Sequence, residues 1–229
     1  MTIVDDMHLV HQVRREQNTF GEIASTILSM ALNDGLGSQR VDIVFDSYWD
    51  ISIKNTEHKR RGNNPSPKLK DITPAQIVRR WRSFLSNTEN KANLIAILVR
   101  EWQKPEFTIC LKNKLLHVTV EDKCFMMTNS GSHEVPSLQS IQDEAVSRLL
   151  LHAVHAAQDR FSSIKITSED TDVLVLCLHF QDQIQASSSK SLVLNTDTDS
   201  LTFRKLPKKL GQRSVQVLLE CMPSLAVIL

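Results

Sequence analysis

The sequence predicts an α/β fold in which a mainly parallel central sheet is flanked by helices, giving three layers. Short apolar runs typical of buried strands alternate along the chain with longer segments whose apolar residues recur at helical spacing. Several of these runs end in acidic residues, as expected at the carboxyl ends of strands in open α/β sheets. Without an internal repeat or a long linker, we expect one domain over 1–229, with a basic arm at about 50–72.

The amino-terminal part of the chain predicts two strands and one helix. The runs at 2–5 and 41–46 are apolar and each ends in aspartate, which indicates strands that stop at a loop. The stretch from about 19 to 33 has helical spacing. A charged, proline-containing connector then extends to about 72.

Two helices are expected after the connector. Thr73-Pro74 predicts a helix start, because proline suits the first helical position, and Ile77, Trp81 and Leu85 would mark its buried side. A second helix is expected over about 89–103.

The second half predicts a strand at 115–120, a loop at Asn129-Ser130-Gly131, a helix at 139–157 and a strand at 163–167. The stretch 182–200 is rich in Ser, Gln, Asp and Thr, which indicates an exposed loop or short hairpin. The helix has a wide apolar face made by residues four apart and their neighbours: Ile141, Ala145, Val146, Leu149, Leu150, Ala153 and Val154.

Composition excludes several classes of protein. With 41% hydrophobic and 23% charged residues and a net charge of +1, the chain is typical of a globular protein and has no global nucleic-acid signature. Glu220 and Pro223 interrupt the long apolar stretch near the carboxyl end, so we expect no membrane span. The four cysteines are widely spaced, which indicates reduced thiols of an intracellular protein.

Acidic residues at expected strand ends are the candidate functional residues. Asp170 and Asp172 follow the strand at 163–167, and Asp5 and Asp46 close the first two strands. Clustered carboxylates can bind a divalent cation or divide acid and base roles between them. The alternative is that they are ordinary loop residues, and that Glu144 only complements the dipole of a helix start.

A local basic cluster follows the second strand. Lys54, Lys59, Arg60 and Arg61 could neutralise the phosphates of a nucleic acid. A solvated loop and a nuclear localisation signal are the alternatives. The histidine pairs, His8 with His11 and His152 with His155, lack the further ligands that a zinc site needs, so zinc is not expected.

Three stretches resemble a known family: VFDSYWDISIKNTEHKRRG, EAVSRLLLHAVHAA and SEDTDVLVLCL. Their order is similar to that in the flap-endonuclease and XPG nuclease superfamily, a branch of the PIN-like nucleases. The chain resembles still more closely a group of uncharacterised animal proteins with a suggested transposon origin. The resemblance runs from about residue 1 to the end of the chain.

The resemblance implies metal-dependent hydrolysis of nucleic-acid phosphodiesters, with one or two Mg²⁺ or Mn²⁺ ions. We expect DNA in preference to RNA as the partner, no membrane, and an intracellular, nuclear location. Lys54, Lys59, Arg60 and Arg61 would belong to the arm that handles the nucleic-acid backbone. The metal ligands would be Asp5, Asp46, Glu144, Asp170 and Asp172, of which all but Asp5 would be catalytic.

Two departures from the family leave other functions open. Val146 replaces the second acid of the helix, and the family's last aspartate would lie beyond Leu229. The apolar residues 224–229 are typical of a buried strand that is cut off, so we expect a fragment of a longer protein. The alternatives to a nuclease are a degenerate nucleic-acid-binding relative and a protein-interaction module.

Overall fold

The computed structural model describes residues 1–13, 19–48, 67–69, 71–142, 145–180, 184, 191–195 and 200–203. Within them, one eight-stranded sheet has the order β5-β4-β3-β2-β1-β6-β7-β8. The strands are β1 (Thr2–Asp5), β2 (Arg40–Val44), β3 (Leu115–Val120), β4 (Lys123–Thr128), β5 (Gly131–Glu134), β6 (Ser163–Thr167), β7 (Ser191–Asn195) and β8 (Ser200–Phe203). The helices are α1 (Asp6–Gln12), α2 (Phe20–Asp34), α4 (Trp81–Leu85), α5 (Thr88–Trp102), α6 (Pro105–Thr108), α7 (Ala145–Gln158) and α8 (Thr171–His179).

The centre of the sheet is parallel. Strands β3, β2, β1, β6 and β7 run in one direction, and β4, β5 and β8 are antiparallel to their neighbours. The chain goes outward from β1 through β2 to β3 and later returns to place β6 on the other side of β1. The strand order therefore reverses between β1 and β6, which makes this point the topological switch of the sheet.

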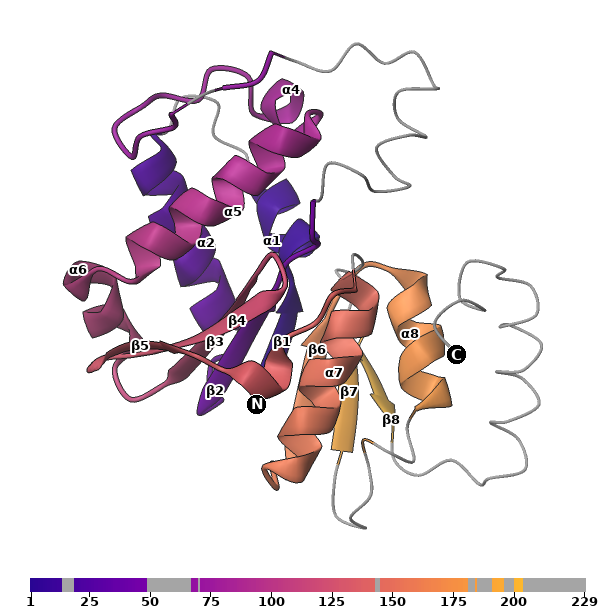
Figure 1. Ribbon diagram of the computed structural model, residues 1–229. Coiled ribbons are helices and arrows are strands. Elements are labelled where there is room, and N and C mark those ends of the chain that lie inside the picture. The colour runs from indigo at the N-terminus through magenta and orange to yellow at the C-terminus, as the bar shows by residue number, and fades with distance from the viewer. Residues whose placement is uncertain are drawn as a thin grey trace.

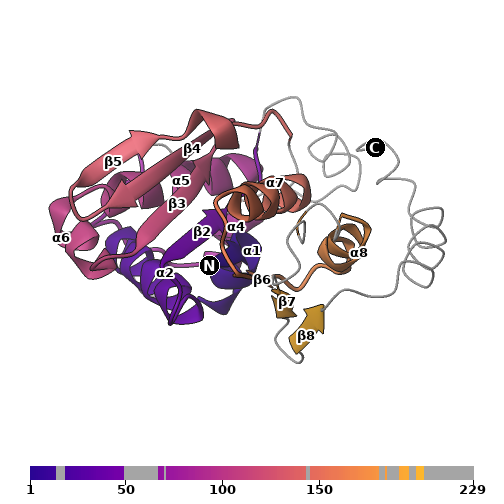
Figure 2. The same cartoon turned by 90° about the horizontal axis from the view of Figure 1, so that it is seen from below.

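Helices cover both faces of the sheet, as Figures 1 and 2 show. Val41 and Ile43 of β2 are buried on one face in a cluster that includes residues of α1, α2, α4 and α5. Ile3 and Val44 are buried on the other face with residues of α7 and α8. The predicted three-layer α/β arrangement is confirmed.

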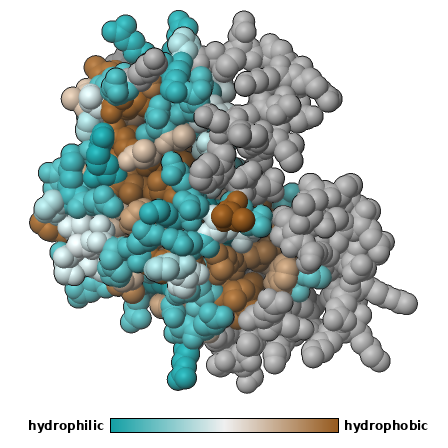
Figure 3. Space-filling model, in the orientation of Figure 1, coloured by the Kyte–Doolittle hydropathy of each residue, from teal (hydrophilic) through white to brown (hydrophobic). Residues whose placement is uncertain are grey.

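Hydrophilic residues cover much of the described surface in Figure 3, and hydrophobic ones gather in a band between them. None of the helices in the described segments is long and apolar enough to cross a membrane.

The prediction of a helix that starts at Thr73 is wrong for most of its length. The structure has only the short α4 at its end, and Ile77 is 56% exposed. The reason is a competing set of hydrogen bonds, in which the amide groups of Phe20 and Gly21 donate to the carbonyl groups of Gln76 and Pro74. The chain around Pro74 therefore caps the start of α2 instead of forming its own helix.

The helix predicted at 139–157 begins later, at Ala145. Residues 139–142 are not helical, and Ile141 is 85% exposed instead of part of the apolar face. The amide of Ser140 donates to the carbonyl of Asp122, which holds this segment against the β3–β4 turn.

One further helix was not expected, and two expected loop regions are hairpins. Helix α1 was not predicted, and it follows β1 without a loop because the Asp5 carboxylate accepts a hydrogen bond from the Met7 amide. The stretch around Asn129 is the turn of a β4–β5 hairpin. Part of 182–200 forms β7, which pairs with β8 as a hairpin and also extends the parallel sheet beside β6. The basic arm at about 50–66 and the expected strand at 224–229 lie outside the described residues.

Candidate functional site

Three of the predicted acids lie at the same edge of the sheet. Asp5 ends β1, Asp46 comes two residues after β2, and Asp170 comes three residues after β6. Because β1 lies between β2 and β6 and all three strands are parallel, their carboxyl ends meet around the topological switch point. Open α/β sheets bind ligands at this position.

Asp5 and Asp170 are joined through one hydroxyl group. Ser168 donates from Oγ to Oδ2 of Asp5 over 2.7 Å, and the same Oγ accepts the amide hydrogen of Asp170 at 3.1 Å. Ser168 is completely buried, so this connection is shielded from water. The loop after β6 is thereby held to the end of β1.

Asp46 is held by the start of α7. Its Oδ1 accepts a hydrogen bond of 2.7 Å from the amide of Ala145, the first residue of that helix. A carboxylate at this position also complements the positive end of the helix dipole. The side chain is half-buried, with access to solvent.

Asp6, which was not among the predicted site residues, belongs to the same group of acids. It is 2% exposed, and its Oδ1 is buried without a hydrogen-bond partner. Burial, followed by the negative charges of Asp46 and Asp5, raises the pKa of Asp6 well above its usual range. The tandem aspartates directly after a buried strand were the available sequence signal.

The neighbouring groups feel the same negative field. Burial raises the pKa of Asp5 against the opposing hydrogen bonds from Ser168 and the Met7 amide. Burial, and then the charges of Asp6, Asp46 and Asp5, also raise the pKa of Tyr48. Like charges are thus concentrated at this edge at a cost to the protein, and such concentration is typical of functional sites.

The other predicted acids have different outcomes. Asp170 caps α8 by accepting the amide hydrogen of Asp172, which lies in the first turn of that helix. Glu144 and the arm residues Lys54, Lys59, Arg60 and Arg61 fall outside the described part of the chain. Val146 is 9% exposed and packs in the apolar cluster beneath α7, so its side chain belongs to the core.

A divalent cation fits the chemistry of these acids. Carboxylate oxygens are the preferred ligands of Mg²⁺ and Mn²⁺, and a cation would relieve the repulsion between Asp5, Asp6 and Asp46. The Oδ1 of Asp6 is buried without a hydrogen-bond partner, so it would be available to such a cation. Among the described residues, no three His, Cys, Asp or Glu side chains are grouped so that they could hold a metal ion.

Comparison of the chain with models of protein families, with curated proteins and with solved structures found no match in any of the three. The resemblance to flap endonucleases and XPG nucleases therefore stays a prediction.

A hollow lined in part by the basic side chains of Arg82 and Lys91 lies beside the acids. It has a volume of about 950 Å³ and is bounded by α1, α4 and the start of α5. Lys91 and Leu85 line it and also line a crevice that reaches Asp6, so the hollow and the acids adjoin. No acidic side chain of the described residues lines the hollow; its walls are His11, Val13, Trp81, Arg82, Leu85, Ser86 and Lys91.

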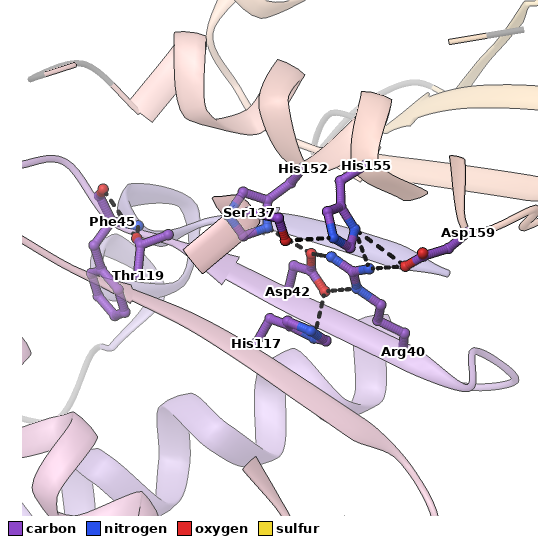
Figure 4. Close-up of polar contacts among 9 residues, drawn as sticks. All are labelled: Arg40, Asp42, Phe45, His117, Thr119, Ser137, His152, His155 and Asp159. Atoms are coloured by element: carbon purple, nitrogen blue, oxygen red, sulfur yellow. Dashed lines mark hydrogen bonds and ion pairs between the residues drawn. The ribbon is translucent and has the colours of Figure 1, made fainter. Parts of the chain in front are cut away.

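A second polar cluster, which we call the α7 network, lies under α7 away from the acids (Figure 4). At its centre is Asp42 on β2, which is fully buried. Its carboxylate accepts bonds of 2.8 and 2.7 Å from the Arg40 guanidinium and lies 2.6 Å from Nδ1 of His152. The network is completed by His117, Ser137, His155 and Asp159.

Opposite charges balance one another in the α7 network. Burial alone would raise the pKa of Asp42, but the hydrogen bond and charge of His152 and the bonds from Arg40 bring it well below its usual range. Burial lowers the pKa of His117 to about 3, against the attraction of Asp42. Both groups therefore keep their neutral-pH charge states, Asp42 ionised and His117 neutral, well into the acidic range.

Ser137, His155 and Asp159 have the spacing of a hydrolase triad, but the Arg40 guanidinium competes with Asp159 for the same histidine nitrogen. Nε2 of His155 is 3.0 Å from Oγ of Ser137, and its Nδ1 is 3.2 Å from Asp159. The Arg40 guanidinium, which can only donate, lies 3.0 Å from that same Nδ1. In the tautomer in which Nδ1 accepts from Arg40, Nε2 carries the hydrogen and cannot take a proton from Ser137.

Proposed function

We propose that the chain is a PIN-like or flap-endonuclease-like domain that hydrolyses nucleic-acid phosphodiester bonds with the help of Mg²⁺ or Mn²⁺. The observation that carries this proposal is the gathering of Asp5, Asp6 and Asp46 at the topological switch point, where burial and the charges of the other two raise the pKa of Asp6. The neighbouring basic hollow supports nucleic acid as the substrate, because Arg82 and Lys91 can neutralise phosphates.

The residues of this chain would divide the work by position. Asp5, Asp6 and Asp46 would hold a cation at the centre of the edge, with Asp170, Asp172 and Glu144 as the remaining acids. Ser168 would orient the Asp5 carboxylate through its 2.7 Å hydrogen bond. A bound Mg²⁺ or Mn²⁺ supplies Lewis acidity toward a phosphoryl oxygen and lowers the pKa of water.

The basic residues would act on the substrate. Arg82 and Lys91 would hold phosphates next to the reacting one, and Lys54, Lys59, Arg60 and Arg61 of the arm would add further contacts. Each such contact increases the salt dependence of binding. We propose that the substrate is DNA in preference to RNA. We also propose that the protein acts in the nucleus, with the basic run as the signal for its import.

A catalytically degenerate nucleic-acid-binding module is the second candidate. The observation that favours it is Val146, whose apolar side chain is buried in the core at the position where the family carries a second acid. A site with fewer carboxylates binds cations more weakly, so binding could persist without cleavage.

The direct test is cleavage of flapped and single-stranded DNA, with RNA of the same sequence in parallel, in the presence of Mn²⁺. The nuclease proposal predicts cleavage that disappears with EDTA and in the Asp46→Asn and Asp170→Asn variants. Asparagine keeps the helix-capping ability of Asp170, so a loss of activity there is not a loss of the α8 cap.

The outcomes separate the candidates. Salt-sensitive DNA binding without cleavage would support the degenerate module, and Arg82→Glu should then weaken binding while Arg100→Glu, outside the hollow, should not. Neither binding nor cleavage would leave only a protein-interaction role.

A further inference from the structure

We propose that Arg148 is a positioning residue for Asp46: its buried guanidinium fixes the backbone at the end of β2 and thereby holds the Asp46 carboxylate at the acidic edge of the sheet. This inference rests on the proposed role of Asp46 as a metal ligand. It assigns a function in that site to a residue that would not touch the metal or the substrate.

Arg148 joins three segments at the carboxyl edge of the sheet. It is 1% exposed and lies one turn into α7. Its Nη1 donates a 2.9 Å hydrogen bond to the carbonyl of Phe45, the residue directly before Asp46. Its Nη2 donates to the carbonyl groups of Glu121, in the β3–β4 turn, and Ser140, before α7.

Hydrogen bonds also hold the residues directly before and after Asp46. Thr119 of β3 accepts the Phe45 amide hydrogen at 2.7 Å, and its Oγ1 is 3.3 Å from the Phe45 carbonyl. On the other side, Ser47 donates to the carbonyl of Glu121 at 2.9 Å. Glu121 thus accepts hydrogen bonds from both Arg148 and Ser47, so the guanidinium and the backbone after Asp46 share one anchor.

Helix α7 is the common support for this arrangement. Ala145 binds the Asp46 carboxylate directly, and Arg148, one turn later, binds the backbone behind it. A shift of α7 along the sheet would therefore move the carboxylate and its backbone together. The fork of an arginine suits this task because it presents several donors in a fixed plane, which a lysine ammonium does not.

A residue that orients a metal ligand has a measurable effect on the affinity for the metal. Loss of a group that orients a metal ligand typically weakens metal binding by about 10–100-fold. We expect this loss for Arg148→Lys, which keeps the positive charge but not the planar fork. The measurement is the Mn²⁺ dissociation constant from isothermal titration calorimetry at pH 7, with folding verified by circular dichroism.

A matched control separates positioning from general damage to α7. His152 is equally buried on the same helix, one turn further on, but its partner is Asp42 in the middle of β2. We expect His152→Gln to lower stability as Arg148→Lys does, while its Mn²⁺ affinity stays within about twofold of the wild type. Similar losses of affinity in both variants would overturn the proposal.

A double-mutant cycle tests whether Arg148 acts through Asp46. In an Asp46→Asn background, Arg148→Lys should cause no further loss of Mn²⁺ affinity. A full additional loss would show that the guanidinium acts by another route and would overturn the inference. If Arg148→Lys does not fold, Thr119→Val releases the same strand end from the other side and should also weaken Mn²⁺ binding; unchanged affinity would contradict the account.

Failure of this inference is distinguishable from failure of the proposed function. Wild-type protein that binds no Mn²⁺ would remove the metal site itself and, with it, any role for Arg148 in positioning. Wild-type protein that binds Mn²⁺, with Arg148→Lys binding equally well, would leave the site in place and refute only the role of Arg148.

Discussion

Two polar clusters contain aspartates only four residues apart, Asp42 in β2 and Asp46 just after it, and the clusters are built in opposite ways. At the carboxyl edge, Asp46 joins Asp5 and Asp6, and burial together with the like charges raises the pKa of Asp6. In the middle of the strand, Asp42 lies between Arg40 and His152, and their contacts lower its pKa. The first cluster destabilises the ionised fold, and the second stabilises it.

The difference teaches how to separate a structural carboxylate from a functional one. A buried aspartate that is hydrogen-bonded to a cation, as Asp42 is to Arg40, holds elements together. Buried aspartates that repel one another persist at a cost, which points to a ligand that relieves it. Burial of a carboxylate alone would not distinguish the two cases.

The largest effect is expected from breaking the balanced cluster. Asp42→Asn leaves the Arg40 guanidinium buried without its main partner, and loss of one member of a buried ion pair costs about 3–5 kcal/mol. Urea unfolding at pH 7 measures the change in the free energy of unfolding. A loss below about 1 kcal/mol would contradict the structural role of Asp42.

The second largest effect is expected in the pH dependence of the free energy of unfolding, through His117. The folded-state pKa of His117 is about 3, below its usual value of 6.5, so the unfolded chain binds a proton that the folded chain does not. Stability from this group is therefore present above pH 6.5 and is lost as the pH falls toward 3, with a slope of up to about 1.4 kcal/mol per pH unit.

Comparison of wild type with His117→Asn isolates this group, because the acids at the edge are common to both. The variant should show a shallower loss of unfolding free energy between pH 6.5 and 4. Parallel curves would show that His117 is not held neutral by the fold.

Removal of one acid from the like-charge cluster should stabilise the protein instead of destabilising it. Asp6→Asn removes a carboxylate whose pKa is raised, so the variant should be more stable than wild type at pH 7 by about 0.5–2 kcal/mol. The gain should shrink as the pH falls, because wild-type Asp6 then becomes protonated and loses its repulsion. Glu106→Gln, an exposed acid distant from the edge, is the control and should change little.

The smallest effect is expected at the rim of the α7 network. Asp159 contacts the Arg40 guanidinium at 3.0 Å, but its side chain is 48% exposed. Asp159→Asn should lower the free energy of unfolding by less than about 1 kcal/mol, as exposed ion pairs do. A loss as large as that of Asp42→Asn would mean that the network does not distinguish buried from exposed partners.

The regular elements of the fold could be predicted from the sequence because their local signals agree with their packing. Helix α5 and strands β1, β3 and β6 match the expected positions within a residue or two. The expectation at Thr73 was wrong because the carbonyl groups of Pro74 and Gln76 bind the start of α2, a long-range contact without a local signal. Strand β7 was expected to be a loop or hairpin because its neighbours are polar, although it pairs with β6 in the interior of the sheet.

The candidate site was predictable only in part. Strand-end position marked Asp5, Asp46 and Asp170, which the topology brings to one edge. Asp6 was missed because its role depends on burial and on the charges around it, neither of which the sequence displays. Arg148 was missed for a similar reason: its partners are carbonyl groups of three separate segments, and carbonyl groups have no sequence signature.

The most direct test of the central claim is thermal unfolding at pH 7 with and without Mn²⁺, for wild type, Asp46→Asn and Asp42→Asn. A cation that binds the folded edge raises the melting temperature by an amount that grows with the logarithm of its concentration above the dissociation constant. The account predicts a Mn²⁺-dependent rise for wild type and for the destabilised Asp42→Asn, and a much smaller rise for Asp46→Asn. The same melting temperature for wild type with and without Mn²⁺, or an equal rise in all three proteins, would contradict it.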